Sequence, residues 1–394
     1  MIKNISSSVK FIGVDDLDLD LFESQYIVPD GISYNSYVIL DEKVAVLDTV
    51  DTRKGEAWKE KLAEALGSRT PDYLVVHHME PDHSALIAWM LEKYPSITVV
   101  ATAAALKMLP QFFEGIALEG RTLAVKEGDT LTLGAHTLRF TMAPMVHWPE
   151  VMVSYESSEK LLFSADAFGR FDAMEKSAFW SSDYDDWVGE ARRYYFNICG
   201  KYGVQVQNLL KKLADTDIAM ICPLHGPILN ENLGYYLGLY QTWSSYGAET
   251  EGILVAYASI HGGTAAAAEH FAGILRKKAC PKVAVADLTR SDLAEAVSDA
   301  FRYDKMVLAA SSYDAGVFTP MHDFLYRLQA KGYQQRTVGL IENGSWAPTA
   351  GRVMKEMLGA MKNITLVEPM VTLCSRMHTD DLPKLEALAD AMLQ

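Results

Sequence analysis

The stretch His78-Met79-Glu80-Pro81-Asp82-His83 places two histidines and two carboxylates within six residues. It follows the apolar run from Tyr73 to Val76, which is typical of a buried strand. Pro81 cannot continue a strand, so the polar residues are expected in a loop at the strand end. Buried carboxylates without partners are unfavourable, and a bound metal removes that penalty. The stretch therefore predicts a metal site; the alternative is a polar loop that carries its histidines by chance.

Three more ligand-type residues stand just after apolar runs farther along the chain. His147, Asp166 and His225 each mark the point where such a run gives way to a loop with proline or glycine. Strand ends on one edge of a sheet are close in space, so these side chains could meet the first group. A lone histidine is more often structural, but the repeated placement favours a shared site. His77 should face away from His78, because neighbouring strand residues point to opposite sides.

The composition excludes several classes of function. The chain has 394 residues, which suggests two or more domains, and its net charge is −15. This negative balance argues against binding to nucleic acid or to an anionic membrane. The start of the chain has no signal-peptide pattern and no apolar run is long enough to span a membrane, so a cytoplasmic protein is expected. The four cysteines form no CxxC pair, which favours reduced thiols.

Residues 1–249 are predicted to form the first domain, with short strands and flanking helices. A hairpin is expected over 32–50, a helix over 54–67, several short strands over 121–165 and mainly helix over 184–214. Hairpins with flanking helices favour a layered αββα sandwich of two sheets between helices.

Residues 250–394 are predicted to form a second domain, in which strands and helices alternate. Five repeats of strand then helix imply a doubly wound, five-stranded parallel sheet covered on both faces. The strands are expected near 253–258, 282–286, 305–310, 337–341 and 364–368, and the helices near 264–278, 291–302, 321–331, 348–361 and 380–393. Such folds bind ligands at the carboxyl ends of their strands.

The loops after the first, third and fourth of these strands carry ligand-binding residue types. The first has hydroxyls at both ends, glycines between them and a helix behind, which suits a phosphate. It resembles the phosphate loop of flavodoxins, and the resemblance implies FMN, with Trp346 or Tyr313 stacked on its ring. The alternative is a generic glycine-rich turn. The predicted flavin-binding residues are Ser259, Ile260, His261, Gly262, Gly263, Thr264, Ser312, Tyr313, Asp314, Ala315, Asn343, Gly344, Ser345 and Trp346.

The metal-type residues resemble those of the metallo-β-lactamase superfamily, whose hydrolases carry His-x-His-x-Asp-His and then His, Asp and His. This chain departs at one position, since Glu80 stands where the hydrolases have their second histidine. With Asp166 as a later bridge, that departure resembles the flavodiiron proteins, also called A-type flavoproteins. The extra carboxylate makes the ligand shell harder and more anionic, which favours iron over zinc.

The flavodiiron resemblance implies two iron ions and a shared aspartate. The first iron would be held by His78, Glu80 and His147, the second by Asp82, His83 and His225, and Asp166 would bridge them. In this family the position of His83 is not always a ligand and can turn away from the iron. Tyr195 resembles a family tyrosine near the diiron pocket that could donate a hydrogen bond or proton; the alternative is packing within a helix.

The resemblance covers essentially the whole chain and implies an oxidoreductase that reduces O2 to water, NO to N2O, or both. Each iron would supply one electron and FMN two, while O2 needs four and a pair of NO molecules needs two. No rubredoxin or flavin-reductase domain follows, so a separate donor such as rubredoxin is expected. The two cofactors would lie at opposite ends of one chain, and a head-to-tail homodimer, or a dimer of dimers, would bring them together.

Two other functions remain open at this point. One is a zinc hydrolase of the glyoxalase II kind with an appended flavodoxin-like domain. The other is an electron carrier whose first domain has lost its metal, although every ligand position is filled. The sequence does not distinguish O2 from NO as the substrate, because both would use the same ligands.

Overall fold

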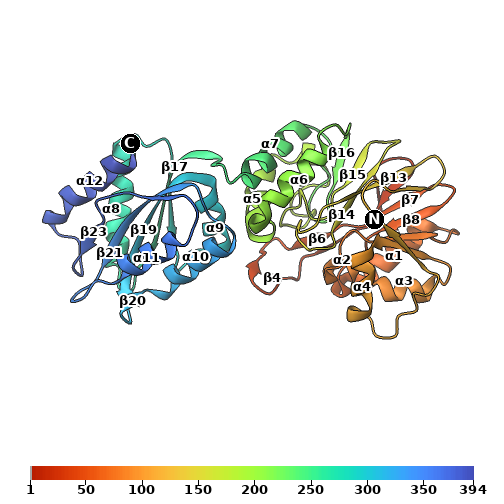
Figure 1. Ribbon diagram of the computed structural model, residues 1–394, viewed down its shortest axis with the longest axis horizontal. Helices are drawn as coiled ribbons and strands as arrows, with labels where there is room; N and C mark the ends of the chain where they lie inside the picture. Colours follow the sequence, from red (N-terminus) through yellow and green to blue (C-terminus); the bar gives the residue numbers. More distant parts are fainter. Residues whose placement is uncertain (1) are drawn as a thin grey trace. The chain divides into compact units, whose positions relative to one another are not determined.

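The computed structural model in Figure 1 describes residues 2–394 of the chain. The chain divides into two compact units, Met1–Tyr240 and Gln241–Gln394. Each unit has its own sheets and its own core, and each is described here by itself.

The first unit ends at Tyr240, earlier than the junction expected after residue 249. The last residues of helix α7 (Leu233–Ser244) and the turn after it belong to the second unit. The Arg336 guanidinium donates to the carbonyls of Tyr246 and Gly247, at 2.7 Å and 3.2 Å. These bonds tie the segment to the second unit, which a composition change alone could not reveal.

Two mixed sheets form the centre of the first unit. The first sheet has the order β1 (Lys3–Asn4), β2 (Val9–Phe11), β7 (Tyr37–Leu40), β8 (Val44–Leu47), β9 (Tyr73–Val75), β10 (Thr98–Thr102) and β11 (Thr122–Val125). The second has the order β12 (Thr130–Thr132), β13 (Thr137–Met142), β14 (Met152–Glu156), β15 (Leu161–Phe163) and β16 (Met220–Cys222). Two small ribbons pair β3 (Val14–Asp16) with β6 (Ile32–Tyr34) and β4 (Leu21–Phe22) with β5 (Tyr26–Ile27).

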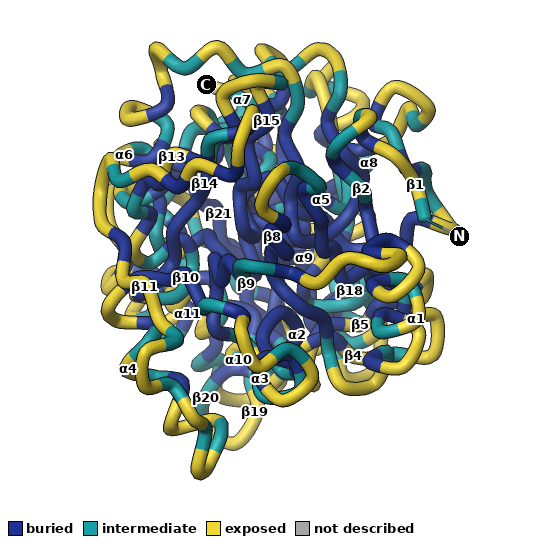
Figure 2. The backbone as a smooth tube through the Cα atoms, turned by 90° about the vertical axis from the view of Figure 1, so that its right-hand side faces the viewer, coloured by how far each residue is buried: buried dark blue, intermediate teal, exposed yellow. Residues whose placement is uncertain are grey.

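The core of the first unit lies between these two sheets. Ile39 on β7, Phe140 on β13 and Phe163 on β15 are buried in one hydrophobic cluster. Full burial of a side chain of this kind contributes roughly 1.5–3 kcal/mol relative to leaving it exposed. The strand β8 is dark blue in Figure 2, in contrast to the yellow loops. The core therefore holds the strands in place and leaves their ends free to carry polar residues.

Helices cover the outer faces of both sheets, so the predicted αββα sandwich is confirmed. In α1 the buried residues Trp58, Leu62 and Ala65 recur at helical spacing, which gives the helix one face to place against the sheet. The helices of this unit are α1 (Gly55–Leu66), α2 (Pro81–Ser84), α3 (Ile87–Lys93), α4 (Ala103–Phe112), α5 (Trp187–Ile198), α6 (Gly203–Leu213) and α7, with 3-10 turns η1 (Thr52–Lys54), η2 (Ser181–Asp183) and η3 (Gly200–Tyr202).

The second unit is a doubly wound parallel sheet, as predicted. Its strand order is β18 (Val283–Asp287), β17 (Thr250–Ala258), β19 (Tyr303–Tyr313), β21 (Arg336–Asn343) and β22 (Ile364–Leu366). Figure 1 shows α8 (Gly263–Lys277) and α12 (Leu382–Met392) on one face, and α9 (Leu293–Arg302), α10 (Thr319–Ala330) and α11 (Ala350–Gly359) on the other. The turn η4 (Thr379–Asp381) leads into α12.

The fifth strand of this sheet differs from the expectation. The expected single strand at 364–368 ends at Leu366, and β23 (Val371–Leu373) continues beside β21. Pro369 lies between the two pieces and has no N–H to donate to the ladder, so the pairing is interrupted there. A short strand, β20 (Gly316–Val317), also folds back antiparallel onto β19.

Across residues 2–394, none of the helices combines the length and the apolar character that crossing a bilayer requires.

Candidate metal centre and flavin pocket

The segment after β9 turns His77 and His78 in different directions. His77 is buried, with Nδ1 2.6 Å from Asp48 Oδ2 and Nε2 2.7 Å from Ser154 Oγ. Its backbone N–H also donates to Asp48 Oδ1 at 2.7 Å. His77 therefore has the structural position that strand alternation predicts, and it anchors the loop that begins with His78.

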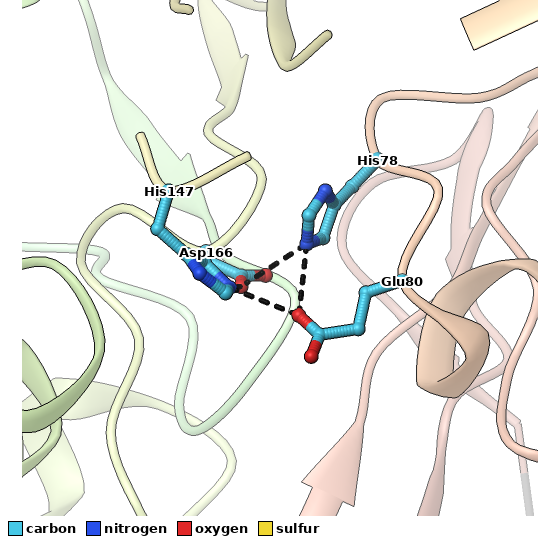
Figure 3. Close-up of side chains that lie close together, drawn as sticks. All are labelled: His78, Glu80, His147 and Asp166. Carbon is cyan, nitrogen blue, oxygen red and sulfur yellow. Dashed lines mark hydrogen bonds and ion pairs between the residues drawn. The ribbon is translucent and has the colours of Figure 1, made fainter. Parts of the chain in front are cut away.

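Four of the predicted ligands form a first cluster, shown in Figure 3. His78 Nε2 lies 3.1 Å from Glu80 Oε2, and His147 Nε2 lies 2.9 Å from the same oxygen. Asp166 Oδ2 is 3.0 Å from His147 Nε2 and 3.7 Å from His78 Nε2. Each side chain offers one ligand atom, and all these atoms lie within 4.8 Å of one another.

Asp82, His83 and His225 form a second cluster with the same closeness. Nε2 of His83 lies 2.9 Å from Nε2 of His225. Asp82 Oδ2 is 3.4 Å from the His83 nitrogen and 3.3 Å from the His225 nitrogen. His83, which the sequence left free to turn away, points into this cluster in the structure.

Asp166 connects the two clusters. Its Oδ2 contacts His147 in the first cluster, and its Oδ1 lies 3.5 Å from Nε2 of His83 in the second. Strand topology explains this position, because β15 and β16 run parallel and in register from Leu161 and Met220. The loops after both strands therefore leave the same edge of the sheet and carry Asp166 and His225 to one place.

The buried donor atoms fit a pair of metal ions. Within residues 2–394, no hydrogen bond reaches Oδ1 of Asp166 or either carboxylate oxygen of Asp82. Buried polar atoms without partners are unfavourable, and carboxylates need a compensating positive charge. Imidazole nitrogens mixed with carboxylate oxygens suit iron better than a thiolate or pure oxygen set would.

The electrostatics of the metal-free clusters are those of tightly coupled acids and bases. Burial opposes the charge on Glu80, but the hydrogen bonds from His147 and His78 prevail and lower its pKa to about 2. Burial likewise opposes the charge on His147, yet Asp166 and Glu80 raise its pKa to about 9. The pKa of His83 is lowered, chiefly because burial disfavours its charged form. In the absence of metal, protons on the histidines thus supply the positive charge that a metal ion would supply in the first cluster.

Two groups outside the clusters hold ligand rings and were not identified from the sequence. Glu150 is buried, with Oε1 3.4 Å from His78 Nδ1 and 2.9 Å from the Met79 N–H that donates to it. Nδ1 of His225 lies 2.7 Å from the carbonyl oxygen of Ser33. Glu150 stands three residues after His147, so a carboxylate beside a ligand was the available signal. The Ser33 carbonyl belongs to the backbone and has no sequence signal at all.

The tyrosine that faces the clusters is Tyr194, whereas the sequence singled out Tyr195. The Tyr194 ring lies 5.5 Å from the His225 ring, and burial together with the charge of Asp166 raises its pKa well above the usual value. Tyr195 instead packs against Tyr240, with ring centroids 5.1 Å apart. Successive residues on α5 point about 100° apart, so only one of the two can face the clusters.

In the second unit, the three predicted flavin loops surround one pocket of about 500 Å³. Every predicted flavin-binding residue lines it except Gly262, which caps the start of α8 in a left-handed conformation. The sequence missed four residues of the lining, which are Ser311, Ala347, Thr349 and Ser375.

The inner end of the pocket suits a phosphate. The N-terminus of α8 opens there, and Thr264 Oγ1 lies 2.8 Å from Ser311 Oγ. A Cβ on Gly263 would come within 2.4 Å of the Ser375 carbonyl oxygen, so this position requires glycine. Helix N-termini and hydroxyls bind phosphate without needing a cationic side chain.

The outer end of the pocket suits an aromatic ring. Trp346 is 93% exposed and Tyr313 is 47% exposed, although both line the pocket. Large aromatic surfaces that remain uncovered commonly mark a ligand or partner site. The pocket thus combines a phosphate end and a stacking end, as FMN requires.

Comparison with known proteins joins these two sites in one family. Residues 32–226 match the family described as ODP family beta lactamase. Diflavin flavoprotein A 1 from Synechocystis sp. is 32% identical over 255 residues, which is 64% of this chain and 44% of that protein. The anaerobic nitric oxide reductase flavorubredoxin of Vibrio vulnificus is 29% identical over 80% of this chain and 64% of its own length.

Solved structures agree with the relatives. The rubredoxin oxygen:oxidoreductase from Desulfovibrio gigas superposes with a TM-score of 0.92, covering 100% of this chain and 98% of that one at 23% identity. The flavodiiron protein from Giardia intestinalis gives 0.91, covering 100% and 96% at 22% identity. The chain belongs to the flavodiiron family. The fold of a flavodiiron protein therefore extends over both units.

Membership in the flavodiiron family supports both predicted cofactors, FMN and a non-haem diiron centre. The donor clusters of the first unit and the pocket of the second fit these groups. The flavodiiron chain nevertheless spans only about half the length of the curated relatives, 44% and 64% of the two named above.

Proposed function

We propose that this flavodiiron chain is an oxidoreductase that reduces O2 to water or NO to N2O at the two clusters. The observation that carries the proposal is Asp166, whose two oxygens face two different ligand sets. A pair of metal positions joined by one carboxylate suits a reaction that delivers several electrons to one small molecule. The proposed ligands are His78, Glu80 and His147 for one iron, Asp82, His83 and His225 for the other, with Asp166 between them.

The stoichiometry of both reactions is compatible with these cofactors. O2 with four electrons and four protons gives two waters, and two NO with two electrons and two protons give N2O and one water. A diiron centre supplies one electron per iron, and FMN passes on two from the donor. We propose a rubredoxin-type protein as the donor and a head-to-tail homodimer as the assembly.

The chain's own residues would hold the metals and control access to them. Glu80 and Asp166 keep negative charge at the first position, which suits a metal that cycles between two charge states. His83 and His225 are buried completely, whereas the side chains of Glu80, Asp82 and His147 are 10–15% exposed. Small gases can therefore approach from the side of these three residues. Tyr194, beside His225, is placed to offer its phenol as a hydrogen-bond donor to a bound substrate.

The decisive experiment compares both gases on one preparation. The chain is loaded anaerobically with FMN and ferrous iron and reduced through rubredoxin reductase and rubredoxin. O2 and NO consumption are followed with electrodes, and N2O is measured by gas chromatography. The proposal expects consumption of at least one gas with water or N2O as product.

A zinc-loaded preparation of the same chain is the matched control. It should fold and bind FMN but form neither water from O2 nor N2O from NO, because zinc has no redox chemistry. If the iron-loaded chain consumes neither gas while its flavin is fully reduced, the proposal is wrong. Thioester cleavage by the zinc-loaded chain would favour the hydrolase alternative.

A further inference from the structure

Glu150 lies behind His78, on the side away from the first cluster. Its Oε1 is 3.4 Å from Nδ1 of His78, while Nε2 of the same ring faces Glu80 at 3.1 Å. That contact is longer than an ordinary hydrogen bond, and within the described residues Nδ1 of His78 has no hydrogen-bond partner. A cation bound at Nε2 would leave the ring proton of His78 on Nδ1, where it faces Glu150.

Glu150 also connects the loops that carry His78 and His147. Its carboxylate accepts the Met79 N–H at 2.9 Å, and its carbonyl oxygen accepts the Thr102 hydroxyl at 3.0 Å. Its own chain segment begins with His147, three residues earlier. One side chain thus holds two ligand-bearing loops at a fixed separation.

The groups that contact Nδ1 of the ligand histidines, on the side away from the metal positions, differ between the two clusters. His78 in the first cluster is backed by a carboxylate, which is a charged acceptor. In the second cluster the Ser33 carbonyl, a neutral acceptor, backs His225 at 2.7 Å. Nδ1 of His83 has no hydrogen-bond partner within residues 2–394. A carboxylate behind a ligand histidine makes the ring a stronger donor than a carbonyl does.

We propose that Glu150 is a positioning residue that makes the two metal positions unequal. It holds the His78 ring with Nε2 toward the first cluster and adds a negative charge behind it. The first position then binds a divalent cation more tightly than the second. In the iron-loaded chain, it also stabilises the higher charge state at the first position. This inference rests on the proposed diiron function for its redox consequence, but not for its metal-binding consequence.

The test uses two variants of the full chain. Glu150→Gln keeps the size and an acceptor for the Met79 N–H but removes the charge. Ser154→Ala is the matched control, because its hydroxyl contacts His77 at 2.7 Å on the same segment without facing His78. Zn²⁺, as a redox-inert probe, is titrated into each FMN-loaded, iron-free protein by calorimetry. The Nδ1–H resonance of His78 is read from nitrogen-15 NMR spectra of the Zn²⁺-loaded samples.

The expected result is a selective change at the first position. Glu150→Gln should weaken the tighter Zn²⁺ equivalent by about 10- to 100-fold, bring the two affinities closer together, and shift the Nδ1–H resonance of His78. Ser154→Ala should leave the ratio of the two affinities unchanged. In iron-loaded protein, Glu150→Gln should also lower the maximum population of the half-reduced centre during a reductive titration.

Three results would overturn the inference. The first is an unchanged ratio of affinities in Glu150→Gln, and the second is an unchanged Nδ1–H resonance of His78 in the Zn²⁺-loaded protein. The third is an equal loss in Glu150→Gln and Ser154→Ala, which would reduce Glu150 to a packing role. None of these depends on gas turnover, so a failure of the proposed reaction would be seen separately.

Discussion

Nε2 of His83 lies 2.9 Å from Nε2 of His225, and the two rings come from loops 142 residues apart in sequence. The His225 Nδ1–H donates to the Ser33 carbonyl, so its Nε2 presents a lone pair to His83 when the ring is neutral. Two ring nitrogens at this distance need a shared proton or a metal between them. In the metal-free centre, protons thus hold the ligand side chains together, whereas in the loaded centre cations would do so.

The stability of the metal-free protein should fall as the pH rises from 6.5 to 9. The folded pKa of His147 is raised from 6.5 to about 9, so its contribution is complete below pH 6.5 and is lost as the pH rises through 9. The folded pKa of Glu80 is lowered from 4.5 to about 2, so its contribution is complete above pH 4.5 and is lost as the pH falls through 2. Calorimetric Tm values from pH 2 to pH 9 check both signs.

The metal-loaded protein is the control for this prediction. Metal ligation already requires neutral His147, so raising the pH removes no proton from it. The Tm difference between loaded and metal-free protein should widen from pH 6.5 to 9. A Tm difference that stays constant from pH 6.5 to 9 would contradict the raised pKa of His147 in the metal-free protein.

Asp166→Asn should lower the affinity of both metal positions, because Asp166 contacts both clusters. His225→Ala should lower only the second. Iron content per chain after equilibrium dialysis distinguishes the two variants, and His136→Ala serves as a histidine control, because the His136 ring contacts Asp41 and Glu159 instead of the proposed ligands. Two tightly held irons in Asp166→Asn would show that the bridge is not needed.

Gly263→Ala should weaken FMN binding. The new methyl group would meet the Ser375 carbonyl at 2.4 Å, and an overpacked site of this kind costs about 1–3 kcal/mol. Gly273→Ala on the same helix is the matched control, since nothing lies within 4 Å of its Cβ; it should stabilise the fold by roughly 0.5–1 kcal/mol. Quenching of FMN fluorescence gives the affinity, and equal affinity in both variants would argue against this pocket.

Trp346→Ala should weaken FMN binding without destabilising the protein. The side chain is 93% exposed, so its removal leaves no cavity in the folded state. A stacked aromatic pair contributes about 0.5–1.5 kcal/mol, which is the expected loss in binding free energy. Tyr326 lies on α10 and is 61% exposed, and Tyr326→Ala should change neither the FMN affinity nor the stability of the protein. An unchanged FMN affinity in Trp346→Ala would place the flavin ring elsewhere.

Tyr194→Phe should reduce gas turnover while metal content and Tm stay close to wild type. Within the described residues the buried Tyr194 hydroxyl has no hydrogen-bond partner, so removing it breaks no bond. If the phenol assists proton delivery, the loss of kcat is on the order of 10²-fold. Tyr195→Phe, on the same helix, should keep the gas turnover of the wild type. If Tyr195→Phe lost turnover and Tyr194→Phe kept it, Tyr195 would be the tyrosine that assists proton delivery.

The sequence by itself determined which residues could form the two sites. Ligand-type residues stood at the ends of four apolar runs, and the loops after three alternating strands carried glycines, hydroxyls and aromatics. Residue type and position at a strand end are local properties, so they can be identified along the chain. Parallel pairing of β15 with β16 brings the ends that carry Asp166 and His225 to one edge of the second sheet, and the packing of the two sheets places His78, after β9 of the first sheet, beside them.

Only the tertiary structure decided which side chains support those residues. Tyr194 rather than Tyr195 faces the clusters, because the rotation of α5 about its axis is set by packing and not by the helical pattern. Glu150 reaches His78 across a sequence separation of 72 residues, and the Ser33 carbonyl reaches His225 across 192. Ser375 closes the flavin pocket from a strand end that the expected elements did not include. Contacts of this kind depend on how separate segments pack together, and no local pattern records that.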